Sequence, residues 1–226
     1  MYINRGTGFW NSMPPVVKNL VILNGIMLLI TFLTGDFMYE KFALFYVESP
    51  LFKPYQLVTH MFMHGNFIHL FFNMYSLIIF GIALESIWGS KKFFIYYMVT
   101  GLGAAALHSL VLFIEVSSLT TAYEAGNLMD SEGITSIMRT PTVGASGAVF
   151  GVLLAYGMLF PNNVLQLIFP PIALKAKWFV MIFGAIELYL GLSNKGSNIA
   201  HFAHLGGMLF GYFLIIYWKK KNRMYF

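Results

Sequence analysis

The sequence predicts an all-α polytopic membrane protein, a bundle of six transmembrane helices. Hydrophobic residues make up 58% of the 226 residues and charged residues only 10%, whereas soluble domains have about 25% charged residues. The mean hydropathy is +0.70. Apolar segments near the ~20 residues that a spanning helix needs recur along the chain, so we expect the excess apolar surface to face lipid.

Six apolar segments follow one another, and each is expected to be a membrane-spanning helix. The fourth and fifth are short for a bilayer whose hydrocarbon core is about 30 Å thick. No repeat, low-complexity stretch or linker divides the chain, so residues 1–226 are predicted to form a single membrane-embedded domain. The segments cover about residues 15–35, 66–88, 93–114, 144–160, 178–193 and 199–218.

The first segment follows basic residues, as the apolar part of a signal peptide does. The stretch Leu33-Thr34-Gly35-Asp36 offers no good small-residue cleavage site, so we interpret the segment as a retained helix. Two long connections follow on the outer side. Residues 36–65 are aromatic and partly apolar, which predicts that they lie partly in the membrane interface. Residues 115–143 are more polar and are expected to connect the third and fourth helices.

Basic residues give the orientation. If the six segments alternate across the bilayer from an inner N-terminus, ten of the fourteen Lys and Arg residues fall inside. Positive residues favour the cytoplasmic side, so both termini are predicted to be cytoplasmic. The net charge of +5 therefore matters mainly through where the basic residues lie, and we expect no nucleic-acid partner. The inner residues are Arg5, Lys18, Lys91, Lys92, Lys175, Lys177, Lys219, Lys220, Lys221 and Arg223, and the outer ones are Lys41, Lys53, Arg139 and Lys195.

The short fourth segment carries a serine at its outer end. From Gly144 to Phe160 it would be about 25 Å long, less than the hydrocarbon core of about 30 Å. Its start near Ser146 is therefore expected to be recessed and reached by water from outside. His204 lies at a comparable depth in the last segment. A serine nucleophile and a histidine base are the groups that nucleophilic hydrolysis needs.

Glycines on the same two segments allow them to pack closely. Gly147 and Gly151 form one small-xxx-small pair, and Gly207 and Gly211 form another on the face that carries His204. Close approach would let His204 act as general base toward the hydroxyl of the serine. Alternatively, the glycines only pack the helices and the serine bonds back to its own backbone.

The second segment carries polar residues near its outer end. His69 and Asn73 are four residues apart and so share a helix face. Both side chains can donate hydrogen bonds, and with the backbone N–H of Ser146 they could stabilise an oxyanion. The alternative is that they satisfy each other or a neighbouring loop.

These motifs resemble those of the rhomboid family of intramembrane serine proteases. The likeness extends in order over all six segments, from about residue 17 to residue 218. The matching motifs are Gly144-Ala145-Ser146-Gly147, the run Ala203-His204-Leu205-Gly206-Gly207-Met208-Leu209-Phe210-Gly211, and His64, His69 and Asn73.

The resemblance implies a rhomboid-like bundle whose catalytic groups are a Ser146–His204 dyad without a third carboxylate. It implies an oxyanion site of His69, Asn73 and backbone amides at Ala145 and Ser146. It also implies transmembrane protein substrates, and a site that opens to the extracytoplasmic side of the bilayer. Gly144, Gly147, Phe150 and Gly207 are expected to support the site, and neither a cofactor nor a metal is expected.

Phe150 stands where family members often have tyrosine, so the aromatic face that would support His204 is kept and the hydroxyl is lost. His201 lies one turn before His204 and is a rival base, but the family pattern and the glycine face favour His204. Glu187 lies in the fifth segment at a similar depth. A triad-like role is conceivable for it, as is a protonated or paired carboxylate.

His60 and His64 are four residues apart and resemble a metal pair, but without an HExxH motif we expect hydrogen bonding. Glu85 falls near the inner side and is expected to be structural. Two other functions stay open: a catalytically inactive rhomboid-like protein that binds membrane helices, and an ion-coupled or proton-coupled transporter. The sequence shows no inverted repeat of the kind that many transporters have, which argues against the transporter.

Overall fold

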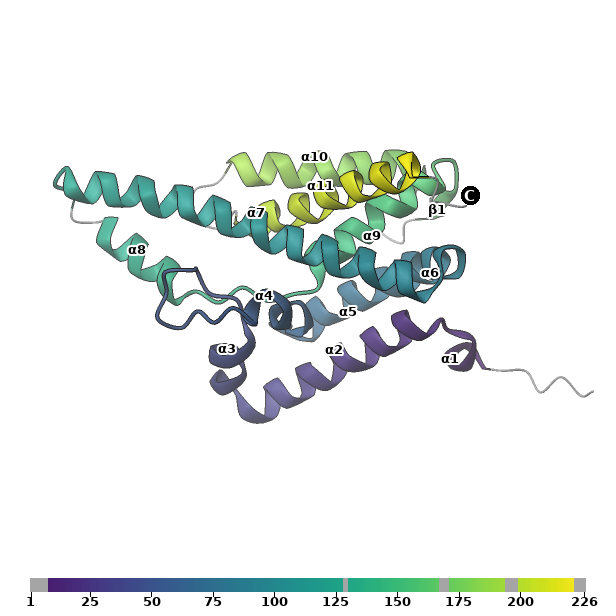
Figure 1. The fold of residues 1–226 in the computed structure, drawn as a ribbon, viewed down its shortest axis with the longest axis horizontal. Helices are drawn as coiled ribbons and strands as arrows, with labels where there is room; N and C mark the ends of the chain where they lie inside the picture. Colours follow the sequence, from purple (N-terminus) through teal and green to yellow (C-terminus); the bar gives the residue numbers. More distant parts are fainter. Residues whose placement is uncertain (1–7, 128–129, 167–170, 194–198, 222–226) are drawn as a thin grey trace, which may run out of the picture.

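The computed structural model describes residues 8–127, 130–166, 171–193 and 199–221, and this part of the chain is almost entirely helical (Figure 1). Five helical stretches are long and apolar enough to cross a membrane. The predicted polytopic helical bundle is therefore confirmed in its main part. The stretches are α2 (Pro15–Thr34), the run of α5 (Phe67–Ser76), η2 (Leu77–Gly81) and α6 (Ile82–Trp88), α7 (Ser90–Glu124), α10 (Ala176–Ser193) and α11 (Ile199–Lys220).

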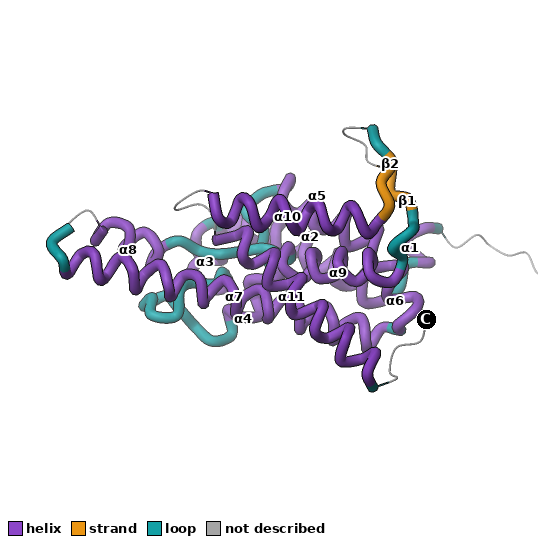
Figure 2. The backbone as a smooth tube through the Cα atoms, turned by 90° about the horizontal axis from the view of Figure 1, so that it is seen from above, coloured by secondary structure: helices purple, strands orange, loops and turns teal. Residues whose placement is uncertain are grey.

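The fourth predicted segment forms α9 (Ser146–Leu159), an apolar helix of 14 residues. Eight of these residues are buried, because α9 packs against α7, α10, α11 and the α5–η2–α6 run. Figure 2 shows α9 within the bundle. A helix enclosed in this way needs no lipid-facing stripe, and small residues allow its neighbours to approach closely.

The remaining described elements are short. They are α1 (Phe9–Ser12), α3 (Asp36–Phe42), α4 (Gln56–Thr59), the 3₁₀ turn η1 (His60–Phe62), α8 (Asp130–Arg139) and the strands β1 (Val164–Gln166) and β2 (Ala173–Lys175). The strands pair antiparallel, with Val164 opposite Lys175. This hairpin departs from the all-α prediction. Pro161 follows the end of α9, and a proline does not continue a helix.

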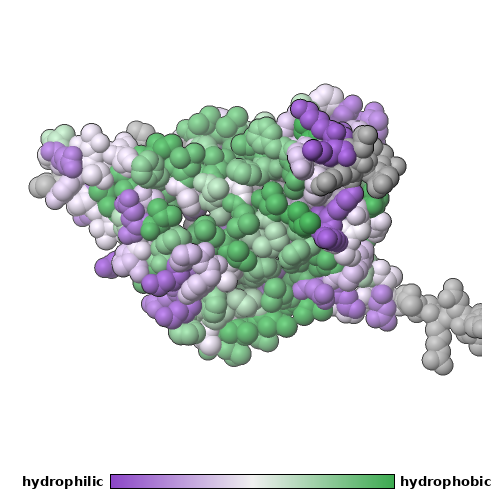
Figure 3. Space-filling model, in the orientation of Figure 1, coloured by the Kyte–Doolittle hydropathy of each residue, from purple (hydrophilic) through white to green (hydrophobic). Residues whose placement is uncertain are grey.

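Apolar side chains cover the middle of the molecule. Figure 3 shows a hydrophobic region on this face, with hydrophilic patches toward both ends of the long axis. Leu33 is 77% exposed on α2, Leu192 72% on α10 and Phe213 60% on α11. A contiguous apolar surface of this kind is the surface of a membrane protein, because water does not favour it.

The prediction for residues 115–143 was incomplete, because most of this connection is helical. α7 continues to Glu124, and α8 follows and packs against it. Residues 115–125 contain no Gly or Pro, so nothing in this stretch stops the helix at the predicted boundary. At 35 residues, α7 is about 52 Å long, well beyond the roughly 30 Å hydrocarbon core.

Glu85 ties α6 to the start of α2. Its buried carboxylate accepts hydrogen bonds from the backbone N–H groups of Val16 at 2.9 Å and Val17 at 2.8 Å, and Ser90 Oγ donates to it at 2.7 Å. The first amides of a helix have no acceptor within that helix, and an anion there is favoured. The expected structural role of Glu85 is confirmed.

Candidate functional site

The segment that leads into α9 is held by backbone hydrogen bonds to residues far away in the chain. Leu44 and Thr142 exchange two hydrogen bonds, at 2.9 and 2.8 Å, and the N–H of Gly144 donates to the carbonyl of His60 at 3.0 Å. Gly144 has a φ of +136°, a conformation that side chains with a Cβ rarely adopt. These constraints fix where α9 starts, and its first residue is Ser146.

Ser146 and His204 meet where α9 and α11 pack together. Ser146 Oγ lies 2.8 Å from His204 Nε2, and both residues are half-buried. The ring of Phe150, one turn after Ser146, stacks on the imidazole with centroids 4.2 Å apart and an interplanar angle of 5°. The serine therefore faces a ring nitrogen and does not bond back to its own helix.

The contact between α9 and α11 depends on glycine. A Cβ on Gly207 would overlap the carbonyl oxygen of Gly147, so the two backbones touch at this point. The expected close approach is present for this pair. Gly151 and Gly211 behave differently, because each lies against side chains of α7. The second members of the two glycine pairs thus pack a third helix.

His69 and Asn73 lie on α5, next to the start of α9. The His69 imidazole covers Gly144, at which a Cβ would come within 3.0 Å of the ring. Asn73 Nδ2 donates to the His69 carbonyl at 2.9 Å, within its own helix. A side-chain amide carries two N–H hydrogens, so one remains for another acceptor. His69 is adjacent to the serine, whereas Asn73 is partly committed to the backbone.

His60 and His64 differ from each other. His60 Nδ1 lies 2.8 Å from the carbonyl of Gln56, as the hydrogen-bonding prediction requires. For His64 that prediction is wrong, because neither ring nitrogen has a partner among the described residues. Burial lowers the pKa of His60 to about 4 and the pKa of His64 to about 3. Both rings are therefore neutral at pH 7.

The lowered pKa of His60 predicts a loss of stability in acid. The unfolded chain, with a pKa near 6.5, takes up a proton between pH 7 and 5 that the folded chain does not. The free energy of unfolding should therefore fall over this range, by about 2 kcal/mol from His60 alone. His60→Gln should remove that part of the fall in unfolding titrations in detergent. An unchanged pH dependence in this variant would contradict the prediction.

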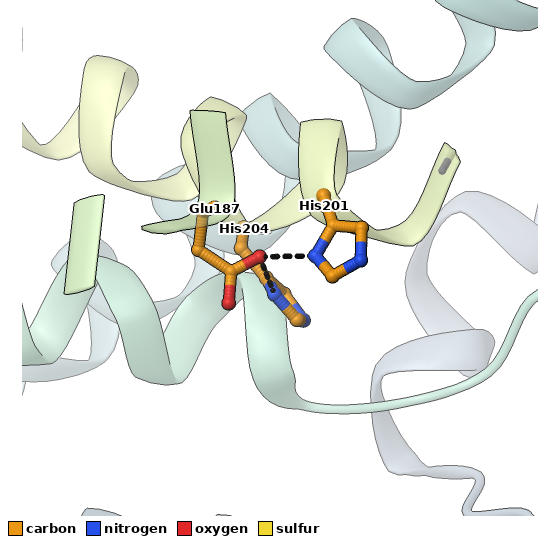
Figure 4. Close-up of side chains that lie close together, drawn as sticks. All are labelled: Glu187, His201 and His204. Atoms are coloured by element: carbon orange, nitrogen blue, oxygen red, sulfur yellow. Dashed lines mark hydrogen bonds and ion pairs between the residues drawn. The ribbon is translucent and has the colours of Figure 1, made fainter. Parts of the chain in front are cut away.

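The structure adds a carboxylate whose role the sequence left open. Glu187 Oε2 lies 2.9 Å from His204 Nδ1 and 2.7 Å from His201 Nδ1 (Figure 4). A carboxylate therefore lies next to the Ser146–His204 pair, where the resemblance implied none. The signal in the sequence was an acidic residue within an apolar helix, which is rare without a function. One carboxylate oxygen and two imidazole nitrogens within 4.8 Å of one another are also a ligand set that Zn²⁺ accepts.

Comparison with known proteins gives matches to one family. The family model of the Rhomboid domain matches residues 52–221. RHOMBOID-like protein 2 of Arabidopsis thaliana is 33% identical over 72% of this chain and 41% of its own length. Rhomboid-like protein 15 of the same plant is 27% identical over 90% of this chain and 47% of its own. Rhomboid protease AarA of Providencia stuartii is 27% identical over 67% of this chain and 51% of its own. The chain thus spans about half the length of these relatives.

Proposed function

The chain belongs to the rhomboid family, and we propose that it is an intramembrane serine endopeptidase that cuts transmembrane proteins in or near their membrane segments. Ser146 is the nucleophile and His204 the general base. The observation that carries the proposal is the 2.8 Å separation of Ser146 Oγ and His204 Nε2 inside an apolar bundle. That distance lies within the range for proton transfer from a nucleophile to its base.

The reaction follows from this pair. Ser146 Oγ attacks the scissile carbonyl carbon while its proton passes to His204 Nε2, and a tetrahedral oxyanion forms. His204 then gives the proton to the leaving amine, the C–N bond breaks and an acyl-enzyme remains. Water, activated by His204 in the same way, attacks the ester carbonyl and releases the new carboxyl terminus with regeneration of the serine.

The oxyanion needs donors that are already in place. α9 begins at Ser146, so its first backbone N–H groups have no acceptor within the helix. The amides at Ala145 and Ser146 are candidate donors, together with the His69 ring and the second N–H of Asn73. Gly144, Gly147, Phe150 and Gly207 support the site by the contacts described above.

We propose six spans with the site open to the extracytoplasmic side. At 14 residues, α9 is about 21 Å long, so an enclosed span of this length starts below the membrane surface. α1 and the end of α11 lie at the same end of the bundle (Figure 1), the end of Lys219 and Lys220. This supports placing both termini in the cytoplasm. Arg5, Lys195 and Arg223, used for the orientation, lie outside the described residues.

We also propose that residues 1–226 act as one membrane-embedded domain. Each described membrane helix contacts at least two others, and α9 touches most of them. The partners of such a domain are the lipid bilayer and transmembrane protein substrates. No second function is favoured by a contact or a distance in the described part of the chain.

The proposal is tested by cleavage of a single-span substrate in liposomes, with the cut mapped by mass spectrometry. A regular helix hides its carbonyls in hydrogen bonds, so the segment must unwind to enter the site. Replacing two glycines beside the cut with alanine stabilises the helix by about 2 kcal/mol, which should slow cleavage roughly tenfold or more. Equal cleavage rates for the glycine and alanine substrates would contradict the idea that the segment unwinds to enter the site. The absence of any cut within or beside the membrane segment would contradict the proposed function.

A further inference from the structure

Glu187 is a buried acidic side chain that the Ser146–His204 pair does not itself require. It lies on α10 and is only 8% exposed. We propose that Glu187 is the third member of a Ser146–His204–Glu187 relay, a positioning residue that holds His204 so that Nε2 faces the serine as an acceptor. The inference rests on the proposed function and deepens it.

The tautomer follows from the hydrogen bonds. An ionised carboxylate can only accept, so the Nδ1 atoms of His204 and His201 must both donate to Glu187 Oε2. A neutral imidazole with its hydrogen on Nδ1 carries a lone pair on Nε2. In His204 that lone pair points at the Ser146 hydroxyl, 2.8 Å away. The carboxylate therefore selects the form of His204 that can take the proton of the serine.

The ring of His204 is held in three directions. Glu187 bonds one nitrogen, Ser146 bonds the other, and Phe150 stacks on the face at 4.2 Å. α9 supplies Ser146 and Phe150, α10 supplies Glu187, and α11 carries the ring itself. A base fixed in this way loses little orientation freedom in the transition state, which is the usual benefit of an orienting third group.

Charge explains why a carboxylate would be placed here. Burying an anion is costly unless it has partners, and within the described residues Glu187 forms no ion pair with Lys or Arg. Its partners are the two imidazoles. When His204 takes the proton of Ser146 it becomes an imidazolium, and the adjacent anion stabilises that charge. The proton then goes to the leaving amine, and Glu187 stays ionised throughout.

His201 shares the same carboxylate oxygen and is the competing partner. Its side chain is 26% exposed, against 18% for His204, so it is the more accessible of the two imidazoles. Within the described residues, His69 on α5 also interacts electrostatically with His204, and its ring packs edge-on against His64 at 5.0 Å. Among these groups, Glu187 is the only anion.

The test compares pH–rate profiles of Glu187→Gln, Glu187→Asp and His201→Leu with those of the wild-type protein. Glutamine keeps the shape but removes the anion, and its amide can donate to His204 Nδ1 and select the wrong tautomer. We expect kcat to fall about 100-fold or more with KM little changed, and the acid limb of the profile to move to lower pH. Glu187→Asp keeps the anion and should restore part of kcat.

His201→Leu gives a change of opposite sign. It leaves the whole carboxylate to His204, so the acid limb should move to higher pH. Tyr189→Phe is the control on the same helix, because Tyr189 is 70% exposed and should leave the profile unchanged. A merely structural role for Glu187 would lower the unfolding midpoint without opposite shifts of the acid limb.

The outcomes separate this inference from the proposed function. Cleavage that survives Ser146→Ala overturns both. Cleavage that needs Ser146 but keeps its kcat and pH profile in Glu187→Gln overturns the relay alone. Loss of wild-type activity in EDTA, with recovery on added Zn²⁺, assigns the cluster to a metal and also overturns the relay. Opposite shifts in Glu187→Gln and His201→Leu, with recovery in Glu187→Asp, support it.

Discussion

Replacing Ser146 with alanine is expected to reduce cleavage of a membrane substrate by about 10⁴-fold or more. Ser146 Oγ is the hydroxyl that lies within hydrogen-bond distance of His204 Nε2 among the described residues. Alanine removes one atom, so the packing of α9 should be kept and the variant should stay folded. The measurement is the initial rate in liposomes, together with the unfolding midpoint of each variant.

The matched variant is His204→Ala, which keeps the nucleophile and removes its base. Labelling by a fluorophosphonate reports directly on an activated serine. We expect labelling of the wild-type protein in the presence of chelators, and its loss in both variants. A protein that only binds membrane helices would give no labelling in any form. Labelling that persists in Ser146→Ala would show that another residue is the nucleophile.

Much of this arrangement could be predicted because it depends on local sequence. The lengths of the apolar segments set the helices within a few residues, except for the third. The run from Gly144 to Gly147 places a serine at the start of a helix, and the spacing of His204 and Gly207 puts both on one face. A resemblance to a family added the catalytic roles of these residues and the class of substrate.

The rest depends on how helices are rotated and where they stop. Glu187 meets His204 only because α10 turns that face toward α11, and spacing within one segment does not specify the rotation. Asn73 was predicted as a donor to the site, yet one of its N–H groups goes to its own backbone. α7 runs past the predicted boundary near residue 114 because polar residues continue a helix as well as apolar ones.

Gly207→Ala is expected to have the largest effect of any single methyl group added to the bundle. The new Cβ would overlap the Gly147 carbonyl oxygen, which is backbone and cannot rotate away. The helices must therefore separate, at a cost of about 3 kcal/mol in the free energy of unfolding. His204 lies one turn before Gly207, so the same separation should lengthen its bond to Ser146 and slow cleavage about 100-fold.

Gly25→Ala is the matched control, because the same change is made in α2, where a Cβ would meet nothing within 4 Å. It should leave activity unchanged and stabilise the helix by up to about 1 kcal/mol. Unfolding titrations with a denaturing detergent measure the free energy of unfolding of both variants. If Gly207→Ala and Gly25→Ala have the same free energy of unfolding, α9 and α11 do not touch through their backbones. In that case the hydrogen bond between Ser146 and His204 would need a different explanation, since this contact brings the two helices together.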